Sequence, residues 1–128
     1  MPGITLRLVA GEFAVCRLPA SEPVPAWAGS AAFSSVTRTA DELSILCPAA
    51  QVPADVKKEA GWRLLKLQGP FAFTETGILS AVLVPLAAAK ISLLATATFE
   101  TDYVCVKAGQ LDDARRALVA AGHTVDGA

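Results

Sequence analysis

Short runs in which hydrophobic and polar residues alternate open the chain and recur along it. Ile4, Leu6 and Leu8 are separated by the polar residues Thr5 and Arg7. Such a period of two is typical of a β-strand with one buried face. Gly11 interrupts the pattern, which then resumes from Phe13. The alternation therefore predicts β-strands at 4–9, 13–18, 62–67, 91–99 and 103–106.

The segment that ends at Cys47 has the pattern of a β-hairpin. Leu43, Ile45 and Cys47 fall on one face of the second strand, and Ala40 and Asp41 mark the turn before it. We therefore expect two antiparallel strands here, with Cys47 facing the core.

Two stretches favour helices. The stretch Gly77–Ala89 is almost entirely apolar, and the Thr76 hydroxyl is placed to cap its first turn. Pro85 lies inside this stretch and has no N–H to donate to the carbonyl of Ala81, so we expect a kink there. A second helix is predicted at 110–121.

Two pairs of matching segments indicate a tandem repeat. Leu6–Ala14 (LRLVAGEFA) and Leu64–Ala72 (LLKLQGPFA) share the frame L-x-x-x-x-G-x-F-A, while Thr37–Ile45 and Thr98–Val106 share a threonine and a turn aspartate. Both matches occur in the same order at nearly equal offsets. The second copy reads β-α-β-β-α-β, and the first has a shrunken helix and no closing helix.

The predicted fold class is therefore α+β, an antiparallel sheet with helices on one face. We expect a degenerate first unit at 1–58 and a complete second unit at 59–128. The strands at 4–9 and 62–67 are expected to hold equivalent places in these two units.

Composition narrows the class of protein. The chain has 128 residues, of which 53% are hydrophobic and 18% charged, enough for one compact domain or two small fused ones. The net charge is −1 with scattered basic residues, which argues against nucleic acid. No signal-peptide pattern opens the sequence, and the most apolar window is shorter than the roughly 20 residues of a membrane span. We expect a cytoplasmic protein with no membrane partner.

Three cysteines, Cys16, Cys47 and Cys105, lie in apolar strand-like runs. Cysteine in such a run behaves as a small hydrophobic residue, so we expect reduced, buried thiols. Metal ligands at short spacing are lacking in the sequence. We therefore expect no metal and no cofactor.

The start of the first predicted helix is the strongest candidate binding site. Backbone N–H groups at Thr76, Gly77 and Ile78 would lie at the positive end of the helix dipole, which suits a carboxylate. Glycine also lets a ligand approach the backbone closely. The alternative is an ordinary capped helix start with no ligand.

The turn formed by Phe99, Glu100, Thr101 and Asp102 is the second candidate. A ligand ammonium group needs a carboxylate, which Asp102 or Glu100 would supply. The alternative is that Asp102 bonds the backbone of its own turn, as aspartate often does.

The first copy offers a matching hairpin. Ser35, Val36, Thr37 and Asp41 lie in it, and the repeat places them beside the helix start of the second copy. Arg38 would meet an acidic ligand group or a neighbouring acid of its own turn, and we favour the local pair.

The sequence has no recognisable set of catalytic residues. His123 is the single histidine, with Asp126 as the nearby acid and no serine or cysteine close in sequence. The nucleophile-elbow, phosphate-loop and zinc-binding patterns do not occur. We expect a protein that is not an enzyme.

The segments 33–48 (FSSVTRTADELSILCP) and 73–106 (FTETGILSAVLVPLAAAKISLLATATFETDYVCV) resemble ACT domains. The whole chain resembles the compact two-ACT proteins related to the CASTOR-type amino-acid sensors. This resemblance implies a ferredoxin-like fold, a regulatory role, and a free amino acid bound at the seam where two ACT units meet, near the glycine turn that opens the first helix. It also implies pairing into a homodimer. The alternative function is a dimerisation or protein-interaction module without a small ligand.

The sequence departs from the family in one loop. The family commonly has glycine between the first helix and the next strand, where this chain has Lys90. If the backbone there needs a positive φ, lysine costs about 1 kcal/mol of stability.

Overall fold

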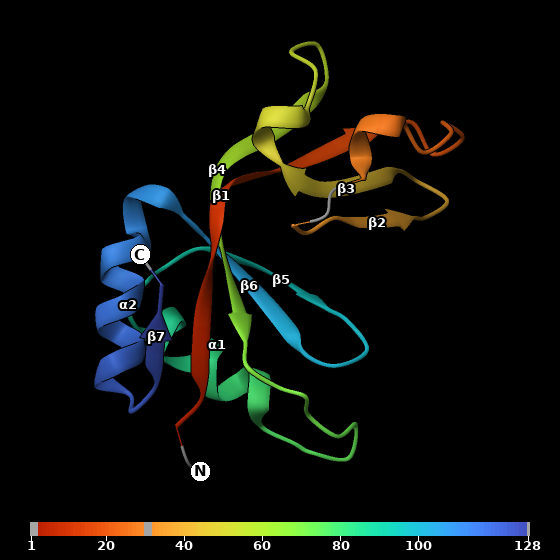
Figure 1. Cartoon of the computed structure of the whole chain (residues 1–128). Coiled ribbons are helices and arrows are strands. Elements are labelled where there is room, and N and C mark those ends of the chain that lie inside the picture. The colour runs from red at the N-terminus through yellow and green to blue at the C-terminus, as the bar shows by residue number, and fades with distance from the viewer. Residues whose placement is uncertain (1–2, 30–31, 128) are drawn as a thin grey trace. The chain divides into compact units, whose positions relative to one another are not determined.

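The computed structural model describes residues 3–29 and 32–127. The chain forms two compact units that do not follow the order of the sequence (Figure 1). The two-helix unit takes the residues up to Ala10 together with those from Arg63 onward. The strand unit is Gly11–Trp62. Two long strands, β1 (Thr5–Leu18) and β4 (Lys57–Leu67), contribute to both units.

The two-helix unit is a sheet with the strand order β7-β1-β4-β6-β5. Its remaining elements are α1 (Ile78–Ala88), β5 (Leu93–Ala97), β6 (Asp102–Lys107), the 3₁₀ turn η3 (Ala108–Gln110), α2 (Leu111–Ala120) and β7 (Thr124–Asp126). β5 and β6 are antiparallel neighbours, and β7 runs parallel to the start of β1. The unit has the mixed α+β architecture that the sequence predicts, and the predicted antiparallel sheet carries one parallel edge strand, β7.

Both helices pack on this sheet through apolar residues four positions apart. Val82 and Leu86 of α1, and Ala114 and Leu118 of α2, are fully buried, because residues at i and i+4 share one helix face. They contact one hydrophobic cluster, whose sheet residues include Leu6, Leu8, Leu65, Leu67, Val104 and Val106.

The strand unit has the order β2-β3-β1-β4 and no α-helix among its described residues. β2 (Ser35–Arg38) and β3 (Leu43–Pro48) form the predicted hairpin, and two 3₁₀ turns, η1 (Ala26–Ala28) and η2 (Ala49–Gln51), stand where helices would be. Trp27 packs against a small cluster formed by Ala14, Cys16, Ala28, Leu43, Ile45 and Cys47.

The faces predicted for the strands at 4–9 and 43–47 are confirmed, but two predicted bounds are wrong. β1 continues through Gly11, which has φ 89°, so the strands at 4–9 and 13–18 are one. The strand predicted at 91–99 ends at Ala97, and Phe99 lies in the turn beyond it.

Ile4, Leu6 and Leu8 are buried at the start of β1. All three cysteines are free and buried. Burial raises the pKa of the Cys47 thiol to about 11, with a smaller contribution from Cys16, and burial alone raises that of Cys105 to about 12.

The prediction that the strands at 4–9 and 62–67 hold equivalent places is wrong. They lie beside each other in the two-helix unit, where the Gln68 N–H donates to the Thr5 carbonyl at 2.8 Å. The reason is that β1 and β4 each supply a strand to both units, which hydrophobic alternation alone does not reveal. The linear boundary between residues 58 and 59 stays a prediction about the repeat.

The repeat is visible in the two hairpin turns, but the structural alignment of the two copies is shifted by two residues from the alignment of their sequences. The Thr39 N–H donates to the Glu42 carbonyl at 2.9 Å, and the Thr98 N–H donates to the Thr101 carbonyl at 2.8 Å. Each threonine hydroxyl also bonds within its own turn. Thr39, rather than Thr37, is therefore the counterpart of Thr98.

The two ends of α1 depend on left-handed backbone. The predicted cap at Thr76 is wrong: Gly77 is the N-cap, with φ 78°, and no side chain bonds there. After the helix, Lys90 has φ 60°, so the positive φ considered in the sequence is present and lysine costs about 1 kcal/mol there.

Candidate ligand-binding site

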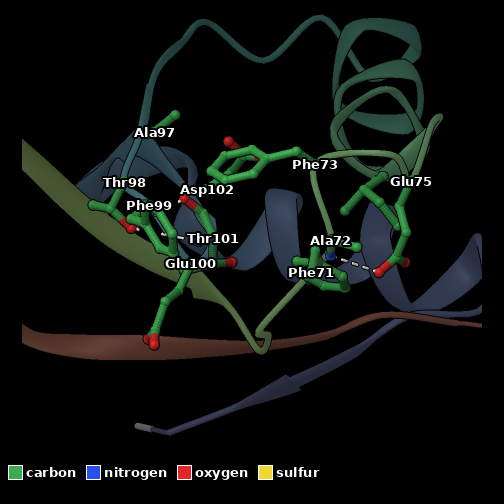
Figure 2. A pocket seen from close by; sticks show the side chains of 11 residues that line it. Phe71, Ala72, Phe73, Glu75, Ala97, Thr98, Phe99, Glu100, Thr101 and Asp102 are labelled. Atoms are coloured by element: carbon green, nitrogen blue, oxygen red, sulfur yellow. Dashed lines mark hydrogen bonds between the residues drawn. The ribbon is translucent and has the colours of Figure 1, made fainter.

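A pocket of about 210 Å³ lies in the two-helix unit, between the loop that leads into α1 and the turn that joins β5 to β6 (Figure 2). Both walls come from one compact unit, so the geometry of the pocket is set within it. Its lining residues are Phe71, Ala72, Phe73, Glu75, Ile78, Ala97, Thr98, Phe99, Glu100, Thr101 and Asp102.

Two phenylalanines on this pocket are strongly exposed. Phe73 is 77% exposed and Phe99 is 80% exposed. Their ring centroids are 5.1 Å apart in an edge-to-face arrangement, and Figure 2 shows the two rings side by side. A large apolar side chain in water is unfavourable, and a grouped pair is typical of a surface that binds something.

The charged side chains of the lining are carboxylates. Glu75 is already engaged, because its Oε1 accepts the Ala72 N–H at 2.8 Å. The Glu100 side chain extends away from the phenylalanine rings in Figure 2, while its carbonyl accepts the Phe71 N–H at 3.0 Å. Asp102 is therefore the carboxylate best placed to meet a positively charged group at the rings.

The start of α1 forms the other wall. Ile78, the first residue of α1, lines the pocket. The Gly77 carbonyl accepts the Ala81 N–H at 3.0 Å and the Ser80 hydroxyl at 3.2 Å. The first amides of a helix have no partner within the helix and carry a partial positive charge. This wall suits a carboxylate.

Five of the predicted site residues line this pocket: Ile78, Phe99, Glu100, Thr101 and Asp102. Thr76 and Gly77 precede Ile78 but do not line it. Thr101 is buried, and its hydroxyl donates to the Leu67 carbonyl at 2.6 Å, so that hydroxyl is committed to the fold. The turn is closed by Thr98.

The predicted residues of the first copy belong to the other unit. Ser35, Val36 and Thr37 lie on β2, and Asp41 lies in the following turn, where its N–H donates to Thr39 Oγ1 at 3.1 Å. Their part in a site stays a prediction. Arg38, for which we favoured a local acidic partner, donates to the Ala20 carbonyl.

Phe71, Phe73 and Glu75 line the pocket but are not among the residues predicted for a site. A phenylalanine in a mostly apolar chain is usually assigned to the core, and Phe71 does pack against it. The signal for Phe73 was its place: it follows Gly69 and Pro70 in a stretch with neither strand nor helix periodicity, where an aromatic residue is not needed for a core.

A second pocket, of about 200 Å³, lies in the strand unit. Three basic residues, Arg17, Lys57 and Lys58, line it together with the two acids Glu42 and Glu59. Its balance of charge is opposite to that of the first pocket. Arg17 also donates to the Asp41 carbonyl at 3.0 Å.

Residues 3–29 and 32–127 contain no group of three or more histidine, cysteine, aspartate or glutamate residues that would hold a metal ion. None of the helices in these ranges is both long and apolar enough to cross a membrane.

Comparison with known proteins supplies the family. A model described as the ACT domain matches residues 57–120, half of the chain, and a second model, described as an N-terminal domain, matches residues 11–55. No curated protein matches the sequence. The crystal structure of an Agobacterium tumefaciens protein is 42% identical and covers 98% of this chain and 94% of its own, with a TM-score of 0.93.

More distant structures share the fold. Aspartate kinase of Clostridium acetobutylicum is 13% identical, with a TM-score of 0.65 over 94% of this chain and 34% of its own. The ligand-free regulatory subunit of aspartate kinase from Thermus thermophilus is 9% identical, with a TM-score of 0.59 over 86% of this chain and 91% of its own.

Proposed function

Because the chain belongs to the ACT-domain family, we propose that it is a non-catalytic regulatory protein that binds a free amino acid or a similar small molecule. The observation that carries this proposal is the pocket of the two-helix unit, which joins a helix start, a carboxylate and two exposed rings. The likeness to a regulatory subunit of aspartate kinase supports the same class of function.

Three features of the two walls, the helix start, the Asp102 carboxylate and the exposed rings, match the three parts of an amino acid. The ligand carboxylate would accept hydrogen bonds, at about 2.9 Å, from the first amides of α1. The ammonium group would lie against the Asp102 carboxylate, and the ligand side chain would cover the rings of Phe73 and Phe99. Burying these rings removes apolar surface from water and so favours binding.

We also propose a cytoplasmic homodimer. β5 is the last strand in the order of its sheet, and a free strand edge is a ready surface for pairing with a second copy. Three buried free thiols are in keeping with a reducing compartment. We propose further that the ligand binds at the seam between two ACT units and that Ser35 to Thr37 and Asp41 contribute contacts to it.

A thermal-shift screen of the twenty amino acids tests the proposal. A ligand that binds the folded protein alone raises its melting temperature. Asp102→Asn should weaken that binding by about 1–3 kcal/mol, and Phe99→Ala should weaken it by removing apolar contact. Asp112→Asn, an exposed acid in the first turn of α2, is the matched control and should bind like the wild type.

Gly77→Val, the obvious way to block the helix start, is not a clean test. Gly77 has φ 78°, where a β-branched residue is strained, so this variant would lose stability as well as binding. The Asp102 and Phe99 variants are preferable because neither changes the backbone of α1.

The exposed pair Phe73 and Phe99 also favours a second function, an interaction module that binds another protein surface through these rings. This alternative holds if no amino acid at millimolar concentration shifts the melting temperature. In that case Phe73→Ser should abolish a self-association that analytical ultracentrifugation detects in the wild type.

A further inference from the structure

We propose that His123 is a positioning residue for the candidate site. Its ring supplies the hydrogen-bond donor that Pro85 removes from α1, and so fixes this helix against the start of β1. The effect on ligand affinity rests on the proposed function, but the effect on α1 does not. His123 does not line the pocket, so it would act through the helix that carries Ile78.

The ring makes two hydrogen bonds that only one form of it satisfies. His123 is 7% exposed. Its Nδ1 accepts the Ile4 N–H at 3.0 Å, and its Nε2 lies 2.8 Å from the Ala81 carbonyl oxygen. Because a carbonyl only accepts, Nε2 must carry the proton, and Nδ1 must keep its lone pair. The ring is therefore the neutral Nε2–H tautomer.

The partner on α1 is the carbonyl that Pro85 leaves without a donor. In an α-helix the carbonyl of residue 81 accepts the N–H of residue 85, and Pro85 has no N–H. A carbonyl left unpaired at a helix–sheet contact is unfavourable. His123 satisfies it from outside the helix, 42 positions away in the chain.

The backbone on both sides of the ring is held in place. The His123 N–H donates to the Leu118 carbonyl at 3.0 Å and the Gly122 N–H to the Val119 carbonyl at 3.0 Å, the pattern of a Schellman motif in which the left-handed residue is Gly122, with φ 96°. The next residue, Thr124, donates its N–H to the Ile4 carbonyl at 3.0 Å. The ring therefore reaches α1 from a fixed base.

The start of β1 fits closely against this base. A Cβ atom added at Gly3 would lie 2.1 Å from the Gly122 carbonyl oxygen, so only glycine allows the approach. This contact brings the Ile4 N–H to the ring. One side chain thus joins the start of β1, the end of α2 and the middle of α1, one helical turn from the pocket.

A double-mutant cycle between His123 and Pro85 tests the proposal. His123→Leu should increase amide hydrogen exchange in the first two turns of α1 at least fivefold and lower the affinity for any amino acid that binds. In the Pro85→Ala background, the new N–H bonds the Ala81 carbonyl, so the same substitution should change α1 exchange less than twofold. Val119→Ala, on the exposed side of α2, is the control and should leave α1 exchange unchanged.

Equal effects of His123→Leu in the two backgrounds would overturn the proposal, because the ring would then be an ordinary core side chain. If His123→Leu does not fold, His123→Phe, which keeps a planar ring but has neither the donor nor the acceptor, replaces it in both backgrounds. Nitrogen-15 NMR of the wild-type ring should show the Nε2–H tautomer, and an Nδ1–H tautomer would overturn the proposal as well. The cycle is read without ligand, so a failed amino-acid screen would refute the proposed function and leave this result intact.

Discussion

The two units have the same sheet topology and differ in the elements that pack on the sheet. Each has the same order of four strands, β2-β3-β1-β4 in the strand unit and β5-β6-β4-β1 in the two-helix unit. In each unit a threonine closes the turn of the hairpin, β2-β3 or β5-β6, and a 3₁₀ turn follows the hairpin. Among the described residues, α-helices lie only on the sheet of the two-helix unit. The shared strand order gives the two units the same sheet topology. The helices of the two-helix unit add its larger hydrophobic core, and the start of α1 adds a wall of the pocket.

The absence of a helix among the described residues of the strand unit has a cause in its sequence. Pro19, Pro23 and Pro25 fall between β1 and β2, where a helix would need a donor at almost every position. Without a helix start there is no row of free amides beside the turn. The pocket of the strand unit lies instead among β1, β3 and β4, with more basic than acidic residues.

The largest effect is expected from the helix-covered core. Leu86→Ala removes a side chain with no exposed surface from α1 and should lower the free energy of unfolding by about 3 kcal/mol. Val84→Ala, on the same helix but 66% exposed, should change it by less than about 0.5 kcal/mol. Urea denaturation at constant pH measures both. Equal losses would mean that α1 does not pack as described.

The buried thiols of both units should lower the stability of the protein at alkaline pH. The pKa of Cys105 in the two-helix unit is raised to about 12 and that of Cys47 in the strand unit to about 11, against 9.0 for an ordinary thiol. The folded state keeps these protons longer than the unfolded chain, so their contribution to stability is complete below about pH 9 and is lost as the pH rises toward 11 to 12.

The measurement is urea denaturation from pH 8 to 10. We expect the wild type to lose about 1 kcal/mol more over this range than Cys105→Ala does. The Cys47→Ala variant should differ from the wild type in the same direction and by nearly the same amount, because both thiols keep their protons in the folded state up to pH 10. A pH dependence that is identical in wild type and both variants would contradict the burial of these thiols.

The smallest effect tests whether the two turns are equivalent. Thr39→Val and Thr98→Val each remove a hydroxyl that bonds within its turn, and each should cost about 1 kcal/mol of stability. Thr37→Val, on exposed β2, is the control and should cost little. If Thr37→Val has the larger effect, the register of the repeat read in the sequence is the correct one.

Much of the fold could be predicted because its cause is local. Alternation at Ile4, Leu6 and Leu8, and at Leu43, Ile45 and Cys47, follows directly from which face of a strand is buried. The predicted cap at Thr76 failed because Gly77 adopts a left-handed conformation that takes over the N-cap. Glycine readily adopts this conformation, but the sequence has two adjacent residues, Thr76 and Gly77, that are both common at an N-cap.

The site was harder to predict because its walls are distant in sequence. Asp102 and Ile78 were found from a turn and a helix start, which are local signals. Phe73 was not, because hydrophobic pattern cannot separate an apolar residue that packs in a core from one that remains exposed at 77%. The link from His123 to Ala81 was also invisible, since it joins residues 42 positions apart.

The two long strands determine how this protein can be divided. A fragment of residues 59–128 would contain α1, α2 and most of the two-helix sheet, yet it would lack the first part of β1, which neighbours β4 and β7. Its β4 would present bare amides and carbonyls along one side, and such an edge recruits other chains. Isolating the unit that holds the candidate site therefore requires grafting the opening segment onto the fragment, since cutting at the predicted boundary would favour aggregation.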